Sequence, residues 1–298
     1  MNIFANFNPI FIVIPILFLL TFNLGTKLKI ANFKQLYYSP KAVLIGLFSQ
    51  IIILPLSAIL IGKFFALSNI FQLGLLLIAA SSGGSSSALF TYLIKGDLEL
   101  SILLTTCSTL LSIFTLPFWL FIVFQSEITY LILLKIIGQN LILCLLPLIL
   151  GFYIHKYSNN NKLYLCILNK LNALIFPLLI LVTTLFFIQH FATLQTSGLT
   201  LFISVLCLII SAMSFIYIIN FVDYFNLFKL NNAAQKRTLV IEVGIQNAAQ
   251  AITIAISPLT FNSEILAIPA IIYALLMNFV LIFYIFYAMI IRKKTTFY

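Results

Sequence analysis

Residues 81–87 read Ser-Ser-Gly-Gly-Ser-Ser-Ser and lie inside an apolar segment that spans 69–94. A second polar stretch with a glycine, Glu-Val-Gly-Ile-Gln-Asn-Ala-Ala-Gln at 242–250, lies in the other half of the chain. A bilayer core offers no hydrogen-bond partners to irregular backbone, so such chain persists there only where protein or a cavity surrounds it. Two interrupted apolar segments, one in each half, are typical of the binding site of a secondary transporter.

The composition of the chain defines its class. Of 298 residues, 63% are hydrophobic and only 7% are charged, whereas a soluble domain carries about 25% charged residues. This composition excludes a water-soluble globule. The net charge of +10 suggests nucleic-acid binding, but the basic residues are spread over short links between apolar stretches, and we expect no nucleic-acid partner.

Apolar stretches of roughly 20 residues are what a helix needs to cross a bilayer core of about 30 Å. We expect nine such spans and therefore an all-α polytopic membrane protein, with one transport domain over residues 1–298. Helices 1–4 cover about 8–124 and helices 5–9 cover about 129–291. The approximate spans are 8–25, 41–62, 69–94, 98–124, 129–155, 170–190, 198–222, 237–257 and 264–291.

The distribution of lysine and arginine predicts the orientation. If the N-terminus is outside, all but two of the 16 basic residues lie on the cytoplasmic side, and the exceptions are Lys63 and Lys135. The positive-inside rule therefore predicts an external N-terminus and a cytoplasmic C-terminus.

Each polar stretch contains the signals for a helix that stops and restarts. Gly83-Gly84 can leave helical geometry at low cost, and Ser85 is a suitable N-cap for a second half-helix. In the eighth span, Gly244 can end the helix and Asn247 can cap the restart. The alternative interpretation is a close contact between helices lined with small residues.

Glu242 is the only carboxylate that lies more than two residues inside an expected span. A charged side chain at that depth costs on the order of 3 kcal/mol and usually marks an ion or proton path. Gln246 and Gln250 follow at i+4 and i+8, and such oxygen atoms suit a small hard cation. An interfacial ion pair with Arg237 is the alternative. The other acidic residues all lie in or beside links: Asp97, Glu99, Glu127, Asp223 and Glu264.

The fourth span adds a stripe of hydroxyl groups at i, i+4, i+7 and i+11, which lie on one face of a helix. Its members are Ser101, Thr105, Ser108 and Ser112. They either line a cavity or bond back to the carbonyl four residues earlier. Gln50 is a lone amide in the second span, where a hydrogen bond between helices is its alternative role. The sequence contains no nucleotide loop, nucleophile motif or metal-ligand spacing. We therefore expect that the protein is not an enzyme and uses no cofactor. Active transport would then be driven by an ion gradient.

At these residues the chain resembles the sodium/bile-acid symporter family, its bacterial branch in particular. The matching stretches are 83–97, which continues through Leu100-Ser101 and 105–110, and 237–247. The early helices around 25–29 and 40–50 are also similar. The resemblance implies two inverted five-helix repeats, a core and a panel domain, and two broken helices that cross at mid-membrane. It also implies that this chain begins at the second helix of the family, so that the first repeat lacks its first helix.

The resemblance further implies sodium-driven uptake of a small organic anion across the cell inner (plasma) membrane by alternating access. One implied sodium site uses Ser87, Ser101, Thr105 and Glu242. The other uses Gln50, Glu242, Gln246 and the backbone carbonyls of Val243 and Ile245. The implied substrate site includes Gly84, Ser85 and Asn247.

One position departs from the family pattern. Ala88 stands where the family usually has asparagine, so the first sodium site lacks one oxygen ligand. The resemblance leaves open whether the anion is a bile acid or a smaller pantoate-like or pyruvate-like carboxylate. It also leaves open a proton-coupled exchanger or an efflux permease on a related broken-helix fold, in which Glu242 carries protons.

Overall fold

The computed structural model describes residues 10–125, 127–158, 161–189, 191–222, 230 and 232–295. Residues 8 and 9 of the expected first span, residue 190 of the sixth and Asp223 therefore lie outside the described residues. Among the described residues every regular element is helical, apart from one isolated β-bridge. The all-α prediction is confirmed.

The first half of the chain folds into short and long helices that follow the expected spans closely. A 3₁₀ segment, η1, precedes α2, and a π-helical segment, η2, joins α3 to α4. The elements are α1 (Ile10–Lys27), η1 (Ile30–Lys34), α2 (Gln35–Tyr38), α3 (Pro40–Phe48), η2 (Ser49–Ile53), α4 (Leu54–Phe64), α5 (Asn69–Ala80), α6 (Ser87–Leu93) and α7 (Leu98–Val123).

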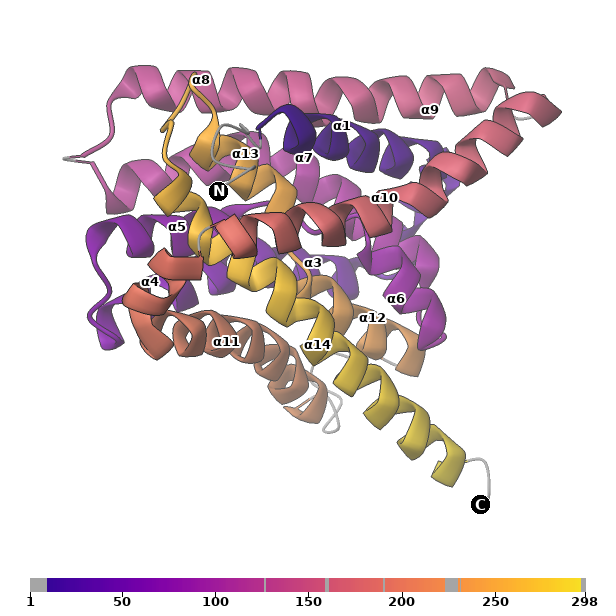
Figure 1. The fold of residues 1–298 in the computed structure, drawn as a ribbon. Helices are drawn as coiled ribbons and strands as arrows, with labels where there is room; N and C mark the ends of the chain where they lie inside the picture. Colours follow the sequence, from indigo (N-terminus) through magenta and orange to yellow (C-terminus); the bar gives the residue numbers. More distant parts are fainter. Residues whose placement is uncertain are drawn as a thin grey trace.

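The second half begins with α8, which continues through a π-helical segment into α9 (Figure 1). Its elements are α8 (Tyr130–Asn140), η3 (Leu141–Leu145), α9 (Leu146–Ser158), α10 (Lys162–Gln189), α11 (Phe191–Val222), α12 (Ala233–Gly244), α13 (Ala248–Ile256) and α14 (Glu264–Thr295). The helix α10 begins at Lys162, eight residues before the expected start at 170, so part of the expected polar link is helical. Gly198 has a φ of 78° inside α11, at the expected start of the seventh span.

Six helical segments among the described residues are long and apolar enough to cross a bilayer. They are Ile10–Lys27, Pro40–Phe64, Leu98–Val123, Tyr130–Ser158, Gly198–Phe221 and Glu264–Phe286. Together with the composition, they make the chain a multi-pass membrane protein. The expected third and eighth spans are each divided between two shorter helices, α5 with α6 and α12 with α13.

The helices α1 and α9 run side by side in Figure 1 and cross at two glycines. A Cβ atom on Gly25 would lie 2.1 Å from the carbonyl oxygen of Leu148, and one on Gly151 would lie 2.1 Å from that of Phe22. Small residues at the interfaces of membrane helices allow the backbones to approach this closely. Any larger residue at either position would force α1 and α9 apart.

Both π-helical segments precede a proline. Pro55 follows η2 and Pro147 follows η3. Proline has no N–H, so the carbonyl four residues earlier loses its usual helical donor. These carbonyls belong to Ile51 and Leu143. Each is approached by a donor from another helix: Trp119 Nε1 at 2.7 Å from Ile51 O, and Thr21 Oγ1 at 3.1 Å from Leu143 O.

Candidate functional site

The two interrupted helices meet at their interruptions. Gly83, between α5 and α6, forms an isolated antiparallel bridge with Gln246, between α12 and α13. The Gly84 N–H donates to Ile245 O at 3.0 Å, and the Asn247 N–H donates to Ser82 O at 2.8 Å. Each irregular segment therefore supplies the hydrogen bonds that the other lacks, as buried backbone requires.

Close approach of the two segments explains the glycine pair. A Cβ on Gly84 would lie 2.7 Å from Ile245 Cγ2 and 3.1 Å from the carbonyl oxygen of Gln246. A Cβ on Gly83 would lie 3.0 Å from the Gln50 amide nitrogen. Neither glycine has a positive φ; among the described glycines, Gly198 is the one that does. Space, and not an unusual backbone conformation, therefore explains these residues.

Glu242 lies in the last turns of α12 and is fully buried. The Ser101 hydroxyl donates to its Oε1, and the Thr105 hydroxyl donates to its Oε2 at 2.9 Å. Ser87 Oγ lies 3.1 Å from Thr105 Oγ1. The structure thus brings the side chains of the first implied sodium site into one cluster. Arg237, the alternative ion-pair partner, donates to the Lys95 carbonyl at 2.9 Å instead.

Two glutamine side chains approach the same region from different helices. Gln50, in η2, donates from Nε2 to the backbone carbonyl of Glu242 at 2.7 Å. Gln246 Nε2 lies 3.2 Å from the carbonyl of Val243. The Oε1 atoms of both amides are buried and have no hydrogen-bond partner. A buried acceptor without a partner is costly, so these oxygens are suited to ligate a cation.

The backbone carbonyls of the second implied site take part in hydrogen bonds of their own. Val243 O accepts from the Gln246 amide, and Ile245 O accepts from the Gly84 N–H. A carbonyl oxygen has two lone pairs, so each retains one for a cation. The end of α12 at Gly244 is what frees these carbonyls from helical bonding.

The implied substrate residues lie at the start of the second half-helices. Asn247 is the N-cap of α13, as predicted, and its Oδ1 accepts from the Gln250 N–H at 3.1 Å. Ser85 is not the cap of α6: that helix begins at Ser87, and its N-cap is Ser86, which makes no side-chain capping bond. The helical restart thus lies one residue later than predicted, because Ser85 and Ser86 form a turn first.

The hydroxyl stripe of α7 faces the interrupted helices along its whole length. Besides Ser101 and Thr105, Ser108 Oγ accepts from the Gly83 N–H at 3.0 Å, and Ser112 Oγ accepts from Gln250 Nε2 at 3.2 Å. These hydroxyls thus contact the two irregular segments, and Ser108 and Ser112 also bond back to the carbonyls of Thr105 and Thr109. That they line a cavity stays a prediction. Ser101 O also lies 3.0 Å from Thr105 Oγ1. Because a hydroxyl has a single proton, Thr105 donates either to Glu242 or back along its own helix, and not to both at once.

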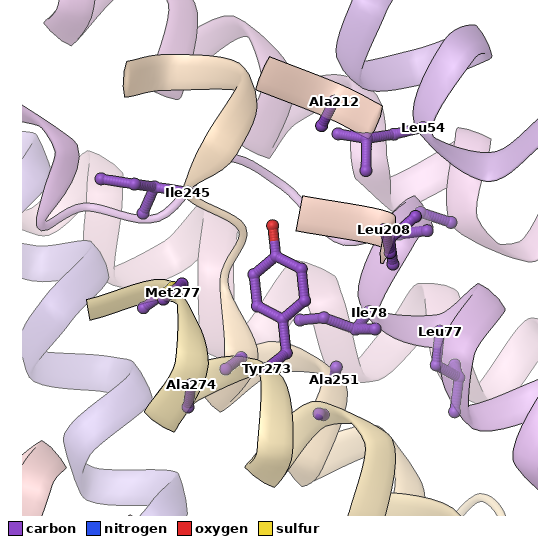
Figure 2. Packing of buried hydrophobic residues seen from close by; sticks show 14 of the residues in the cluster. Leu54, Leu77, Ile78, Leu208, Ala212, Ile245, Ala251, Tyr273, Ala274 and Met277 are labelled. Carbon is purple, nitrogen blue, oxygen red and sulfur yellow. The ribbon is translucent and has the colours of Figure 1, made fainter. Parts of the chain in front are cut away.

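The sequence pattern did not reveal two further contacts at this site. Gln250 accepts from the Ser82 N–H and hydroxyl, both at 2.9 Å, and its Nε2 lies 3.2 Å from Asn140 Oδ1 of α8. Figure 2 shows Tyr273 of α14 among apolar side chains that include Ile78 and Leu208, and its hydroxyl donates to Gly244 O at 3.0 Å. Asn140 was recognisable as a polar residue in an apolar run, whereas nothing marked Tyr273.

Residues 14–224 match the Sodium Bile acid symporter family. The hepatic sodium/bile acid cotransporter of Rattus norvegicus is 31% identical over 268 residues, which cover 86% of this chain and 69% of the rat protein. The P3 protein of Mus musculus is 28% identical over 251 residues, covering 82% of this chain and 51% of the mouse protein. The sodium-dependent organic anion transporter of Bos taurus is 29% identical over 187 residues, covering 61% of this chain and 48% of that protein.

Proposed function

This chain belongs to the sodium bile acid symporter family, and from that premise we propose that it is a sodium-coupled symporter of a small organic anion. The family is one of transporters, and no enzymatic activity is part of the proposal. The chain spans 69% of the rat relative and about half of the other relatives described. Its activity and its substrate are therefore proposals, argued from the family and from the contacts of its own residues.

The observation that carries the proposal is the setting of Glu242. Within the described part of the chain, this fully buried carboxylate accepts hydrogen bonds from the hydroxyls of Ser101 and Thr105. Close to it, the side-chain oxygens of Gln50 and Gln246 are two of the buried amide oxygens that lack a hydrogen-bond partner. An unpaired buried carboxylate is costly, and a bound cation offsets that cost. Neutral oxygens around one carboxylate suit a hard monovalent ion such as sodium.

We assign two sodium sites that share Glu242. The first uses the hydroxyls of Ser87, Ser101 and Thr105, and the second uses Gln50, Gln246 and the carbonyls of Val243 and Ile245. In the first site, both carboxylate oxygens are bonded to hydroxyls that can rotate to present oxygen lone pairs. In the second, the amide oxygens already lack donors. The first site has one neutral ligand fewer than the family pattern because of Ala88.

The anion binds beside Gly84, Ser85 and Asn247 in this proposal. The N-terminus of α13 carries the positive end of its helix dipole, which favours a carboxylate. Placing the anion next to the sodium sites lets each ligand lower the electrostatic cost of binding the other. Because the anion and sodium stabilise each other in this way, the movement of the anion is coupled to that of sodium.

We propose that the protein crosses the cell inner membrane nine times, with its N-terminus outside and its C-terminus in the cytoplasm. The pairs α5 with α6 and α12 with α13 serve as two broken helices that cross near the midplane, within inverted repeats that form a core and a panel. The whole of residues 1–298 acts as one transport domain. Alternating access then moves the panel against the core around the sites.

The test is uptake by vesicles that contain the purified protein. Radiolabelled carboxylates are supplied in parallel, namely a conjugated bile acid and small oxo- and hydroxy-carboxylates, under an inward sodium gradient, an equal potassium gradient or a proton gradient. We expect at least one carboxylate to accumulate under the sodium gradient and under neither of the other two gradients. Equal uptake with a proton gradient and no sodium would favour the exchanger. Failure of every carboxylate with every gradient would refute the symporter.

A further inference from the structure

We propose that Trp119 is a positioning residue for the sodium site that contains Gln50, because its indole N–H holds the backbone segment on which Gln50 lies. This inference rests on the proposed function. It concerns η2, the π-helical segment Ser49–Ile53, and the one tryptophan in the sequence. Trp119 lies on α7 and is 8% exposed.

The segment η2 needs a donor from outside the helix. Pro55 lacks an N–H, so the carbonyl of Ile51 loses its normal donor four residues later. The segment itself has the wider π spacing, with the Leu54 N–H bonded to Ser49 O. Single π segments of this kind occur often at functional sites, where they change the direction of one side chain. Without another donor, the Ile51 carbonyl would favour a different local geometry.

Trp119 supplies that donor. Its Nε1 lies 2.7 Å from Ile51 O, a short hydrogen bond for a neutral pair. A buried tryptophan usually finds some partner for its N–H, so the bond alone is not evidence of a role. The identity of the acceptor is evidence of a role, because this carbonyl belongs to the residue directly after Gln50 and has no α-helical donor at Pro55.

The direction of the Gln50 side chain depends on this backbone. Its Nε2 is fixed on Glu242 O at 2.7 Å, and its Oε1 is left without a partner. A shift of one residue in a helix turns a side chain by about 100°. If η2 relaxed toward regular α-helix, Gln50 would turn away from Glu242 and its oxygen would leave the sodium site. Trp119 therefore acts on sodium through Gln50 and does not touch the ion.

The structure contains a matched control. The segment η3 also precedes a proline, Pro147, and Thr21 Oγ1 lies 3.1 Å from the carbonyl of Leu143. The arrangement again combines a π segment, a proline and a polar group from another helix, but the Thr21 hydroxyl also lies 2.9 Å from Leu17 O on its own helix. None of the residues assigned to sodium or to the substrate lies on η3. Removing the Thr21 hydroxyl tests the loss of such a bond without affecting the site.

The experiment compares Trp119→Phe and Thr21→Val with the wild type. Two quantities are measured: the sodium concentration for half-maximal uptake, and the sodium-induced rise in unfolding temperature of the purified protein. One buried hydrogen bond is worth about five-fold in affinity. We expect Trp119→Phe to raise the half-maximal sodium concentration by about that factor and to keep the maximal rate at saturating sodium. Thr21→Val should leave the sodium dependence unchanged.

A double-mutant cycle establishes the route of the effect. In a Gln50→Ala background, Trp119→Phe should cause no further loss of sodium-induced stabilisation, because the residue it positions is absent. The inference is overturned if Trp119→Phe lowers the maximal rate at an unchanged sodium midpoint, or if its effect adds in full to that of Gln50→Ala. If sodium neither drives uptake nor stabilises the wild type, the proposed function itself has failed.

Discussion

Replacing Glu242 by glutamine removes one charge and keeps the shape of the side chain. The carboxylate is fully buried, and its two oxygens accept from Ser101 and from Thr105. In Glu242→Gln one of these oxygens becomes an NH₂ group, which cannot accept. One hydroxyl must therefore turn to another acceptor, and any bound cation loses its only charged ligand among the residues assigned to the two sites.

The expected loss in sodium affinity is large. Two unit charges about 4 Å apart interact by roughly 4 kcal/mol at an effective dielectric constant of about 20. Part of this is offset because the carboxylate no longer has to be desolvated. A conservative figure for the loss in sodium binding free energy is about 3 kcal/mol, and each 1.4 kcal/mol corresponds to about a ten-fold change in affinity. We therefore expect the half-maximal sodium concentration to rise by at least about 100-fold.

The assay measures unfolding temperature in detergent against sodium concentration, with choline replacing sodium at constant ionic strength. We expect sodium to stabilise the wild type and to leave Glu242→Gln unaffected. Without sodium, the variant should unfold at a temperature no lower than the wild type, because a neutral amide needs no counter-charge in a buried site. Glu264→Gln, at the exposed first residue of α14, is the charge-matched control and should respond to sodium as the wild type does. Sodium stabilisation of Glu242→Gln at wild-type concentrations would refute the assignment.

Three further predictions concern other parts of the chain. Ala88→Asn should restore the missing ligand of the first sodium site, raising apparent sodium affinity by about ten-fold or the Hill coefficient for uptake toward two; unchanged values for both would mean that the site is already complete. Gly84→Ala places a Cβ 2.7 Å from Ile245 Cγ2 and should lower stability by about 1–3 kcal/mol in denaturant unfolding, whereas Gly138→Ala, where no atom lies within 4 Å of the new Cβ, should not. A reporter protein that is active only in the cytoplasm should be active when it is fused after Tyr298. Activity of a reporter that works only on the external side would contradict the predicted orientation.

The sequence alone predicted the class of the protein and the two segments in which its helices are interrupted, although α5 ends at Ala80, three residues before the predicted break at Gly83-Gly84. Long apolar runs with few charges allow only membrane helices, and this conclusion needs no tertiary contact. The end of α12 at Gly244 and the cap at Asn247 follow from local backbone chemistry, since glycine leaves a helix at low cost and asparagine bonds the first free amide. The start of α6 was predicted one residue too early.

The partners of these residues could be found only in the folded chain. Ser82, Gly83 and Gly84 pair with residues that follow them by more than 160 positions, and no local pattern encodes which extended segment meets which. The same holds for the approach of Ser101 and Thr105 to Glu242, which the sequence suggested only through a family resemblance. The bond from Trp119 to Ile51 O was not foreseen at all. Helix starts and stops depend on neighbours along the chain, whereas a cation site depends on oxygens that distant helices bring together, and only packing decides that.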